Sequence, residues 1–167
     1  MSTASVPLAF LFTDIEGSTR LWEAHPDAMQ AALACHDARL RAVIAAHGGE
    51  VFKTIGDAFC VTFSSPLEAV QAALEAQREL TAEPCGALEL RVRMAVHSGT
   101  AESRDGDYFG QPLNRVARLL AAGHGGQVLV SQAVHEQVKD QLPPEVCLLD
   151  LGERRLKDLA QPEHIYQ

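Results

Sequence analysis

Asp14 ends an apolar run and is followed by a short turn of small residues, Gly17, Ser18 and Thr19. Such a stretch is typical of a buried strand that leads into the first turn of a helix. A helix start presents unpaired N–H groups and a positive dipole end, and a glycine lets the backbone approach an anion closely. Phosphate therefore fits beside Asp14, with a hard divalent cation between the two. On this stretch alone, a helix-capping role for Asp14 is supported equally well.

A second carboxylate, Asp57, lies between two strand-like runs, residues 50–55 and 58–63. The Gly56-Asp57 pair is typical of a hairpin turn, which accounts for Asp57 without any chemistry. If the hairpin lies beside the strand that ends at Asp14, however, the two carboxylates face one another and repel. A pair of divalent ions relieves that repulsion, which favours a two-metal site for phosphoryl or nucleotidyl transfer.

The elements around these carboxylates follow from hydrophobic periodicity and turn residues. The pattern predicts helices over 21–47 with a break at Pro26, from 66 to about 80, from the 108–112 segment to Gly123, and after Ser131. It predicts a strand that stops at Asp14, strands over 50–55, 58–63, 88–97, 128–130 and 146–151, a turn-rich stretch over 98–106, and a C-terminal edge strand. The first six elements match the split βαβ arrangement of a ferredoxin-like core. We therefore expect an α+β fold with a βαββαβ core and an additional C-terminal helix and strands.

Length and composition narrow the possible classes of protein. The chain has 167 residues, so we expect one domain spanning 1–167. Hydrophobic residues make up 47% and charged residues 22%, which argues against global disorder. The net charge of −8 argues against a nucleic-acid partner, because binding to DNA or RNA depends on a basic surface. No stretch reaches the ~20 apolar residues that cross a bilayer, and the start does not resemble a signal peptide, so we expect no direct membrane insertion.

The cysteines lie far apart in the chain and form no C-x-x-C pair; they are Cys35, Cys60, Cys85 and Cys147. This spacing predicts neither a zinc site nor a disulfide framework. Because free thiols persist in a reducing compartment, we expect the chain to reside in the cytoplasm.

Three separated motifs, taken together, resemble the catalytic domain of class III adenylate and guanylate cyclases. They are the stretch 12–19 around Asp14, the stretch 53–57 that ends at Asp57, and Asp107-Tyr108-Phe109-Gly110 with Asn114 and Arg118 in a G-x-x-x-N-x-x-x-R register. The resemblance covers nearly the whole chain. Between Gly99 and Asp107 the connection is several residues shorter than in animal members, which resembles a bacterial adenylate cyclase type with a short dimerisation arm.

The resemblance implies that Asp14, Asp57 and the carbonyl of Ile15 hold two divalent ions per site. The ions would be Mg²⁺ or Mn²⁺, which prefer such oxygen ligands. They would lower the pKa of the ribose 3′-hydroxyl and hold the triphosphate, next to the 17–19 turn, while the hydroxyl attacks the α-phosphorus and pyrophosphate leaves. No protein nucleophile is required.

The resemblance also assigns roles to three residues outside this loop. Arg118 would stabilise charge on the phosphoryl group in the transition state, and Asn114 would orient the ribose. Both can reach one ligand, because residues four apart on a helix share a face. Lys157 resembles the lysine that contacts the terminal phosphates. Without the other motifs, Arg118 and Lys157 would be interpreted as ordinary surface charges.

Lys53 and Asp107 bear on the choice of base. Adenine presents an acceptor at N1 and a donor at its 6-amino group, which an ammonium and a carboxylate complement. Guanine presents the reverse pattern and would favour an acid in place of Lys53, so the pair predicts ATP. Asp105, two residues before Asp107, is the alternative acid if the alignment slips by two positions.

One chain carries both residue sets that the family places on two domains, the metal aspartates and the groups for base, ribose and transition state. The resemblance therefore implies a head-to-tail homodimer with composite sites and an inactive monomer. The resulting prediction is an adenylate cyclase, a lyase that converts ATP to 3′,5′-cyclic AMP and pyrophosphate. Guanylate cyclase is the nearest alternative. A non-catalytic ATP-sensing or dimerisation module with the same fold is the alternative from another class.

Overall fold

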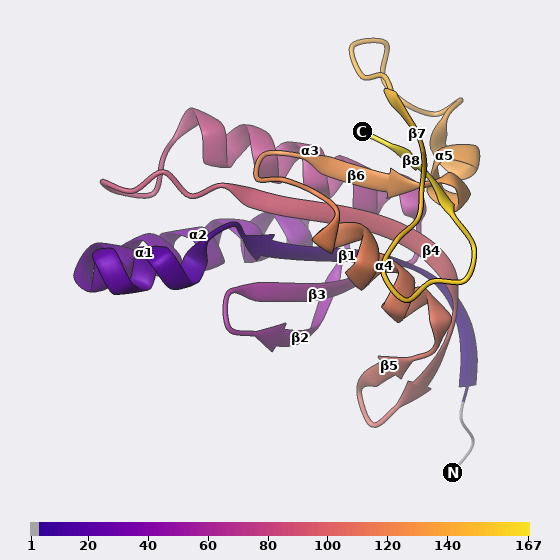
Figure 1. Ribbon diagram of the computed structural model, residues 1–167, viewed down its shortest axis with the longest axis horizontal. Coiled ribbons are helices and arrows are strands. Elements are labelled where there is room, and N and C mark those ends of the chain that lie inside the picture. The colour runs from indigo at the N-terminus through magenta and orange to yellow at the C-terminus, as the bar shows by residue number, and fades with distance from the viewer. Residues whose placement is uncertain (1–3) are drawn as a thin grey trace.

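The computed structural model describes residues 4–167 as one sheet with helices on both faces (Figure 1). Its strands are β1 (Ala4–Ile15), β2 (Glu50–Ile55), β3 (Ala58–Phe63), β4 (Val92–Arg104), β5 (Asp107–Phe109), β6 (Val128–Ser131), β7 (Asp150–Arg154) and β8 (Glu163–Tyr166). Its helices are α1 (Ser18–Ala24), α2 (Pro26–Ala46), α3 (Pro66–Ala82), α4 (Gln111–Ala121) and α5 (Gln132–Val138). None of the helices in these residues combines the length and the apolar character that a bilayer span requires.

The strands follow the order β2-β3-β1-β4-β6-β8-β7, and β5 pairs with the end of β4. β1 lies between β3 and β4 and is antiparallel to both, as in a βαββαβ core. β6 runs parallel to β4 and brings the C-terminal helix and strands onto the sheet. This topology confirms the predicted α+β fold with a ferredoxin-like core.

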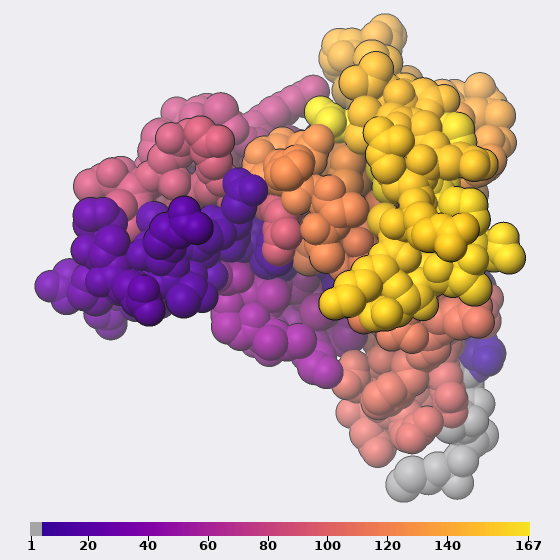
Figure 2. Space-filling model, viewed as in Figure 1, coloured from indigo at the N-terminus to yellow at the C-terminus, as the bar shows by residue number. Residues whose placement is uncertain are grey.

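The two faces of the sheet are covered by different helices. On one face, α2, α3 and α5 pack against alternate residues of β1, including Leu11 and Ile15. On the other face, α4 and the segment 156–159 pack around Phe10. Because side chains alternate along a strand, Asp14 belongs to this second face. Figure 1 shows α4 crossing in front of the sheet, and Figure 2 shows this face with the yellow C-terminal segment beside the orange α4.

Local sequence signals set the helix boundaries. Pro26 separates α1 from α2, as predicted, because proline can begin a helix but disrupts its interior. Ser65 caps α3 by accepting a hydrogen bond from the N–H of Glu68 at 3.4 Å, and Pro66 occupies the first turn. Gly49 lies between α2 and β2, where a Cβ would come within 2.6 Å of the Phe63 ring. The glycine therefore allows the chain to turn tightly against the core.

The prediction of a turn-rich stretch over 98–106 is wrong. β4 continues to Arg104, because its polar second half pairs with the N-terminal half of β1. The turn is confined to Asp105 and Gly106, whose φ values of 51° and 78° suit a two-residue hairpin into β5. The 108–112 segment consequently begins as a strand, and α4 starts only at Gln111.

Other predicted strand boundaries also need correction. β4 begins at Val92 rather than at residue 88, and the strand predicted at 146–151 is β7, at Asp150–Arg154. The C-terminal strand is not an edge strand, because β8 pairs with β6 on one side and with β7 on the other. The burial of Ile165 and Tyr166 agrees with this interior place in the sheet.

Two of the cysteines correct the expectation that the chain has no disulfide. Cys35 on α2 and Cys85, which follows α3, form a disulfide with their Cα atoms 5.7 Å apart. They are 50 residues apart in sequence and match no motif; α2 packs on α3, and this brings them together. The other two remain free thiols, Cys60 buried in β3 and Cys147 exposed.

Candidate active site

Asp14 lies near the end of β1, directly opposite Arg93 of β4 in the antiparallel register. The Arg93 guanidinium donates to both carboxylate oxygens, from Nε to Oδ1 at 2.7 Å and from Nη2 to Oδ2 at 2.5 Å. These hydrogen bonds raise the pKa of Arg93 above its ordinary value. The Asp14 side chain keeps 21% of its surface exposed, so the carboxylate remains accessible from solvent.

Asp57 contacts the same end of β1 from the turn between β2 and β3. The backbone N–H of Ile15 donates to Asp57 Oδ1 at 3.2 Å, across 42 residues of sequence. Asp14, Ile15 and Asp57, which the sequence motifs proposed as metal ligands, are therefore neighbours in space. No cluster of three or more His, Cys, Asp or Glu side chains suited to a metal occurs within residues 4–167. The candidate donors are thus two carboxylates and a backbone carbonyl.

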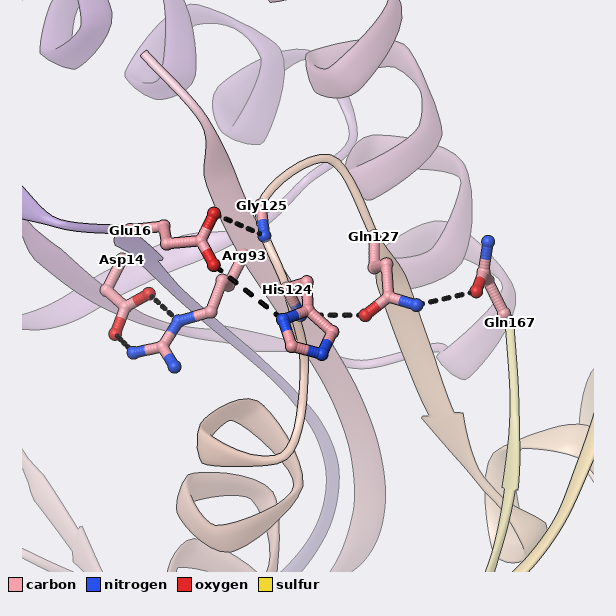
Figure 3. Close-up of polar contacts among 7 residues, drawn as sticks. All are labelled: Asp14, Glu16, Arg93, His124, Gly125, Gln127 and Gln167. Carbon is pink, nitrogen blue, oxygen red and sulfur yellow. Dashed lines mark hydrogen bonds and ion pairs between the residues drawn. The ribbon is translucent and has the colours of Figure 1, made fainter.

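Glu16 hydrogen-bonds the loop after Asp14 to the segments around Arg91 and Gly125 (Figure 3). Its backbone N–H donates to the carbonyl of Arg91 at 2.8 Å, and its carboxylate accepts from the N–H of Gly125 at 3.2 Å. A Cβ on Gly125 would lie 2.3 Å from Cβ of Arg91 and 2.8 Å from Glu16 Oε2, so only glycine fits this contact. Figure 3 shows the same network continuing through His124 to Gln127.

Gly17 occupies the N-cap of α1 with a φ of 69°, a conformation that glycine adopts without strain. This cap has no side-chain hydrogen bond, so the helix-capping role considered for Asp14 is not observed. Ser18 and Thr19 lie inside the first turn of α1, Ser18 half-buried and Thr19 exposed. The 17–19 turn therefore presents backbone groups and two hydroxyls immediately after the carboxylate of Asp14.

Lys53 of β2 and Asp107 of β5 meet on the same face of the sheet. Lys53 Nζ lies 3.4 Å from Asp107 Oδ2, and the backbone N–H of Tyr108 donates to Asp107 Oδ1 at 2.8 Å. Both oxygens of this carboxylate therefore have partners within the chain. Asp105, the alternative acid, lies in the exposed hairpin turn, so the structure pairs Lys53 with Asp107.

Asn114 and Arg118 lie one turn apart on α4, as their spacing predicts. Arg118 Nη2 donates to Asp158 Oδ2 at 2.8 Å, and Asp158 lies in the loop between β7 and β8 with a φ of 64°. Lys157 precedes Asp158 and is exposed, while Leu156 anchors the loop in the core. Within residues 4–167, no hydrogen bond or ion pair joins these residues of α4 and its loop to Asp14 or Asp57.

The structure adds Arg93 to the residues that the motifs single out, and it gives Glu16 of the 12–19 motif a contact that the sequence does not assign. Arg93 belongs to the polar side of an alternating strand, and that alternation is the only sequence signal for it. Its role beside Asp14 depends on the register between β1 and β4, which the sequence does not specify. The contact of Glu16 depends on a loop 109 residues further along the chain.

Comparison with known proteins identifies the family. A family model described as the adenylate and guanylate cyclase catalytic domain matches residues 2–161. The chain belongs to this cyclase family. The match confirms the resemblance carried by the three motifs and covers the elements that hold Asp14, Asp57, Lys53 and Arg118.

Individual relatives align over nearly all of the chain. The uncharacterised protein Rv0891c of Mycobacterium tuberculosis is 36% identical over 162 residues, which cover 96% of this chain and 55% of the relative. A receptor-type adenylate cyclase of Trypanosoma equiperdum is 31% identical, and the alignment covers 96% of this chain and 44% of the relative. The chain thus spans about half the length of these relatives.

A solved structure supports the same assignment. An adenylate cyclase of Trypanosoma brucei, described in its monomeric state, superposes with a TM-score of 0.83 at 29% identity. The superposition covers 96% of this chain and 87% of that chain. The chain therefore shares the fold of this cyclase.

Proposed function

We propose that the chain is an adenylate cyclase that converts ATP to 3′,5′-cyclic AMP and pyrophosphate. The observation that carries the choice of ATP is the pairing of Lys53 with Asp107 at 3.4 Å. Together they offer a donor to N1 of adenine and an acceptor to its 6-amino group, whereas guanine would meet a donor with its own N1 donor. A wrong base leaves polar groups unpaired once the bound base covers them, which costs up to about 1–3 kcal/mol and discriminates between substrates.

The oxygen donors at the end of β1 could hold two divalent ions, which would share or displace the hydrogen bonds from Arg93 to Asp14. Asp14, Asp57 and the Ile15 carbonyl supply only oxygen, which Mg²⁺ and Mn²⁺ prefer, and Mg²⁺ sites commonly combine one or two carboxylates with substrate phosphates. When bound, the ions supply Lewis acidity toward the ribose hydroxyl and the phosphates. Arg93 offsets the negative charge of Asp14 and adds a cation beside a triphosphate.

The remaining residues bind and orient the nucleotide. Asn114 and Arg118 project from one face of α4, so an amide can hold the ribose while a guanidinium neutralises charge that develops on the phosphoryl group. Arg118 exchanges Asp158 for the phosphoryl group when substrate binds. This exchange costs little free energy, because the ion pair is solvent-exposed and contributes only about 0–1 kcal/mol. Lys157, next to Asp158, faces solvent and is available to the terminal phosphates, as are the N–H groups of the 17–19 turn.

We infer that the active unit is a head-to-tail homodimer. Asp14 and Asp57 have no direct polar contact with Asn114 or Arg118 among residues 4–167, so a composite site between two copies would unite the two sets. With ATP as substrate, the compartment we propose is the cytoplasm, where thiols are kept reduced and the Cys35–Cys85 pair would be open.

Product analysis tests this function. The purified chain is incubated with ATP or GTP, in Mg²⁺ and in Mn²⁺, over a range of protein concentrations. We expect cyclic AMP from ATP only, with specific activity that rises with concentration, and loss of turnover in Asp14→Ala. Cyclic GMP as the main product would overturn the base assignment. Tight ATP binding without product under every condition would favour the sensing module, and unchanged turnover in Asp14→Ala would exclude the metal assignment.

A further inference from the structure

A β-bulge in β2 places two consecutive side chains on the same face of the sheet. The register between β2 and β3 shifts between Val51 and Lys53, so that Lys53 lies opposite Cys60. Cys60 in turn lies opposite Phe12, which belongs to the α4 face. Phe52 packs on this same face, since its ring centroid lies 6.4 Å from that of Phe12. In a regular strand Phe52 and Lys53 would point to opposite faces, and the bulge removes this constraint.

Tyr108 of β5 packs against Phe52 of β2. The two ring centroids lie 5.0 Å apart in an edge-to-face arrangement, and Phe10 completes the group at 5.9 Å from Tyr108. Tyr108 also donates its backbone N–H to Asp107 Oδ1 at 2.8 Å. The two aromatic rings therefore belong to the residues immediately next to Lys53 and Asp107 in sequence. We call Phe10, Phe52 and Tyr108 the aromatic wedge.

The ion pair alone is too weak to hold β5 against β2. Lys53 keeps 48% of its side chain exposed and Asp107 keeps 31%, and exposed pairs are worth about 0–1 kcal/mol. β5 is a three-residue strand that pairs with β4 only, within the described residues. The wedge supplies apolar area and edge-to-face contacts that the hairpin lacks elsewhere. Phe109, on the opposite side of β5, is 41% exposed and stacks on Arg104 of the same hairpin.

We propose that the contact between Phe52 and Tyr108 sets the spacing of Lys53 and Asp107, so that both aromatic residues are positioning residues for base selection. This inference rests on the proposed function, because it assumes that Lys53 and Asp107 contact the base. The bulge and the wedge act together: the bulge turns Phe52 toward Tyr108 while Lys53 still reaches the carboxylate. Misplacement of a positioned group by about 1 Å can reduce turnover by up to about 100-fold, so a displaced β5 weakens discrimination without removing either charged residue.

The test compares Tyr108→Leu with Tyr108→Phe, which keeps the ring, and with Phe109→Leu, the matched aromatic substitution on the other side of the same strand. The first readout is kcat/KM for ATP and for GTP with Mn²⁺ at a protein concentration that saturates activity. The second readout does not depend on turnover: calorimetric binding of 3′-deoxy-ATP and 3′-deoxy-GTP, which lack the attacking hydroxyl. Thermal unfolding is recorded for every variant.

We expect Tyr108→Leu to lower the ATP-to-GTP ratio of kcat/KM about tenfold, mainly through a higher KM for ATP, and to lower the preference for 3′-deoxy-ATP by a similar factor. Tyr108→Phe and Phe109→Leu should retain the wild-type ratio. If Tyr108→Leu does not fold, Phe52→Leu replaces it with the same expectation. A folded Tyr108→Leu or Phe52→Leu with the wild-type ratio overturns the proposal. A wild-type chain without preference for ATP overturns the proposed function instead.

Discussion

His97 is a buried histidine whose protonation opposes folding. It lies in β4 with Nδ1 2.7 Å from Ser131 Oγ, and burial, assisted by the nearby charge of Arg115, lowers its pKa from 6.5 to about 4. Between pH 6.5 and pH 4 the unfolded chain therefore binds more protons than the folded chain. As the pH is lowered from 6.5 to 4, the free energy of unfolding should therefore fall by up to about 3 kcal/mol. Above about pH 6.5, His97 should have no effect on the pH dependence of stability.

Urea unfolding at pH 7.5 and at pH 4.5 measures this effect. His97→Asn keeps a polar group toward Ser131 but cannot be protonated, so its loss of stability between the two pH values should be smaller than that of the wild type. An equal loss in both proteins would show that carboxylates elsewhere, and not His97, control the acid sensitivity.

The cysteine residues should differ sharply in reactivity. Burial raises the pKa of Cys60 to about 11, in spite of the nearby Lys53 charge, whereas Cys147 is exposed. The thiolate is the reactive form, so iodoacetamide at pH 8 should add to Cys147 alone when the chain is folded and oxidised. Cys35 and Cys85 are protected by their disulfide. Intact-mass measurement should show one adduct before, and four after, reduction and unfolding in urea; an adduct at Cys60 in the folded chain would contradict the burial.

At the scale of elements, an ion pair between Arg115 and Glu163 holds α4 against the C-terminal strands. Arg115 Nη1 lies 2.5 Å from Glu163 Oε2, and Glu163 Oε1 accepts from the N–H of Gln132 at the start of α5 at 3.1 Å. The Glu163 side chain is only 11% exposed. Glu163→Ala leaves the Arg115 charge without a partner and should lower the free energy of unfolding by on the order of 3 kcal/mol. This is the low end of the range for breaking a buried ion pair, because Arg115 is partly hydrated.

Thermal and chemical unfolding measure that cost, with Glu153→Ala on the exposed strand β7 as the control. The control should stay within about 0.5 kcal/mol of the wild type, because its side chain is exposed. A Glu163→Ala variant as stable as Glu153→Ala would show that the pair contributes only to the geometry of α4.

The elements of the βαββαβ core were predictable from sequence because each carries its own local signal. Pro26 and Ser65 mark helix starts, and the Gly56-Asp57 pair marks the hairpin. The length of β4 was not predictable, since its outer half is polar and is extended by pairing with β1 rather than by its own pattern. The interior place of β8 likewise depends on β7, a strand whose residues are all half-buried or exposed.

The candidate site was predictable to the extent that it follows motifs. Asp14, Asp57 and the Lys53–Asp107 pair were named from sequence, and the structure brings each set together. Arg93 and the contact of Glu16 were not, because they depend on a strand register and on a loop distant in sequence. The same holds for the Cys35–Cys85 disulfide, since a cysteine spacing without a motif says nothing about which helices lie side by side.

At the scale of the whole molecule, composite sites predict complementation between two inactive variants. Asp14→Ala would lack a proposed metal ligand and Arg118→Ala the proposed transition-state cation, so each variant alone should have lost its activity. In an equal mixture, random association of copies makes about half of the dimers mixed, and one of the two sites in each mixed dimer has both residues intact. The mixture should therefore recover about one quarter of the wild-type activity at the same total concentration of chain.

Dilution provides the control for complementation. Because the recovered activity requires association of two chains, it should fall more steeply than the protein concentration on dilution. The activity of the wild type should show the same steep fall. Recovery should be absent when Asp14→Ala is mixed with Asp57→Ala, since both substitutions then remove ligands of the same half-site and no dimer regains an intact site. Failure of the Asp14→Ala and Arg118→Ala mixture to recover, with both variants folded and dimeric, would mean that each chain completes its own site.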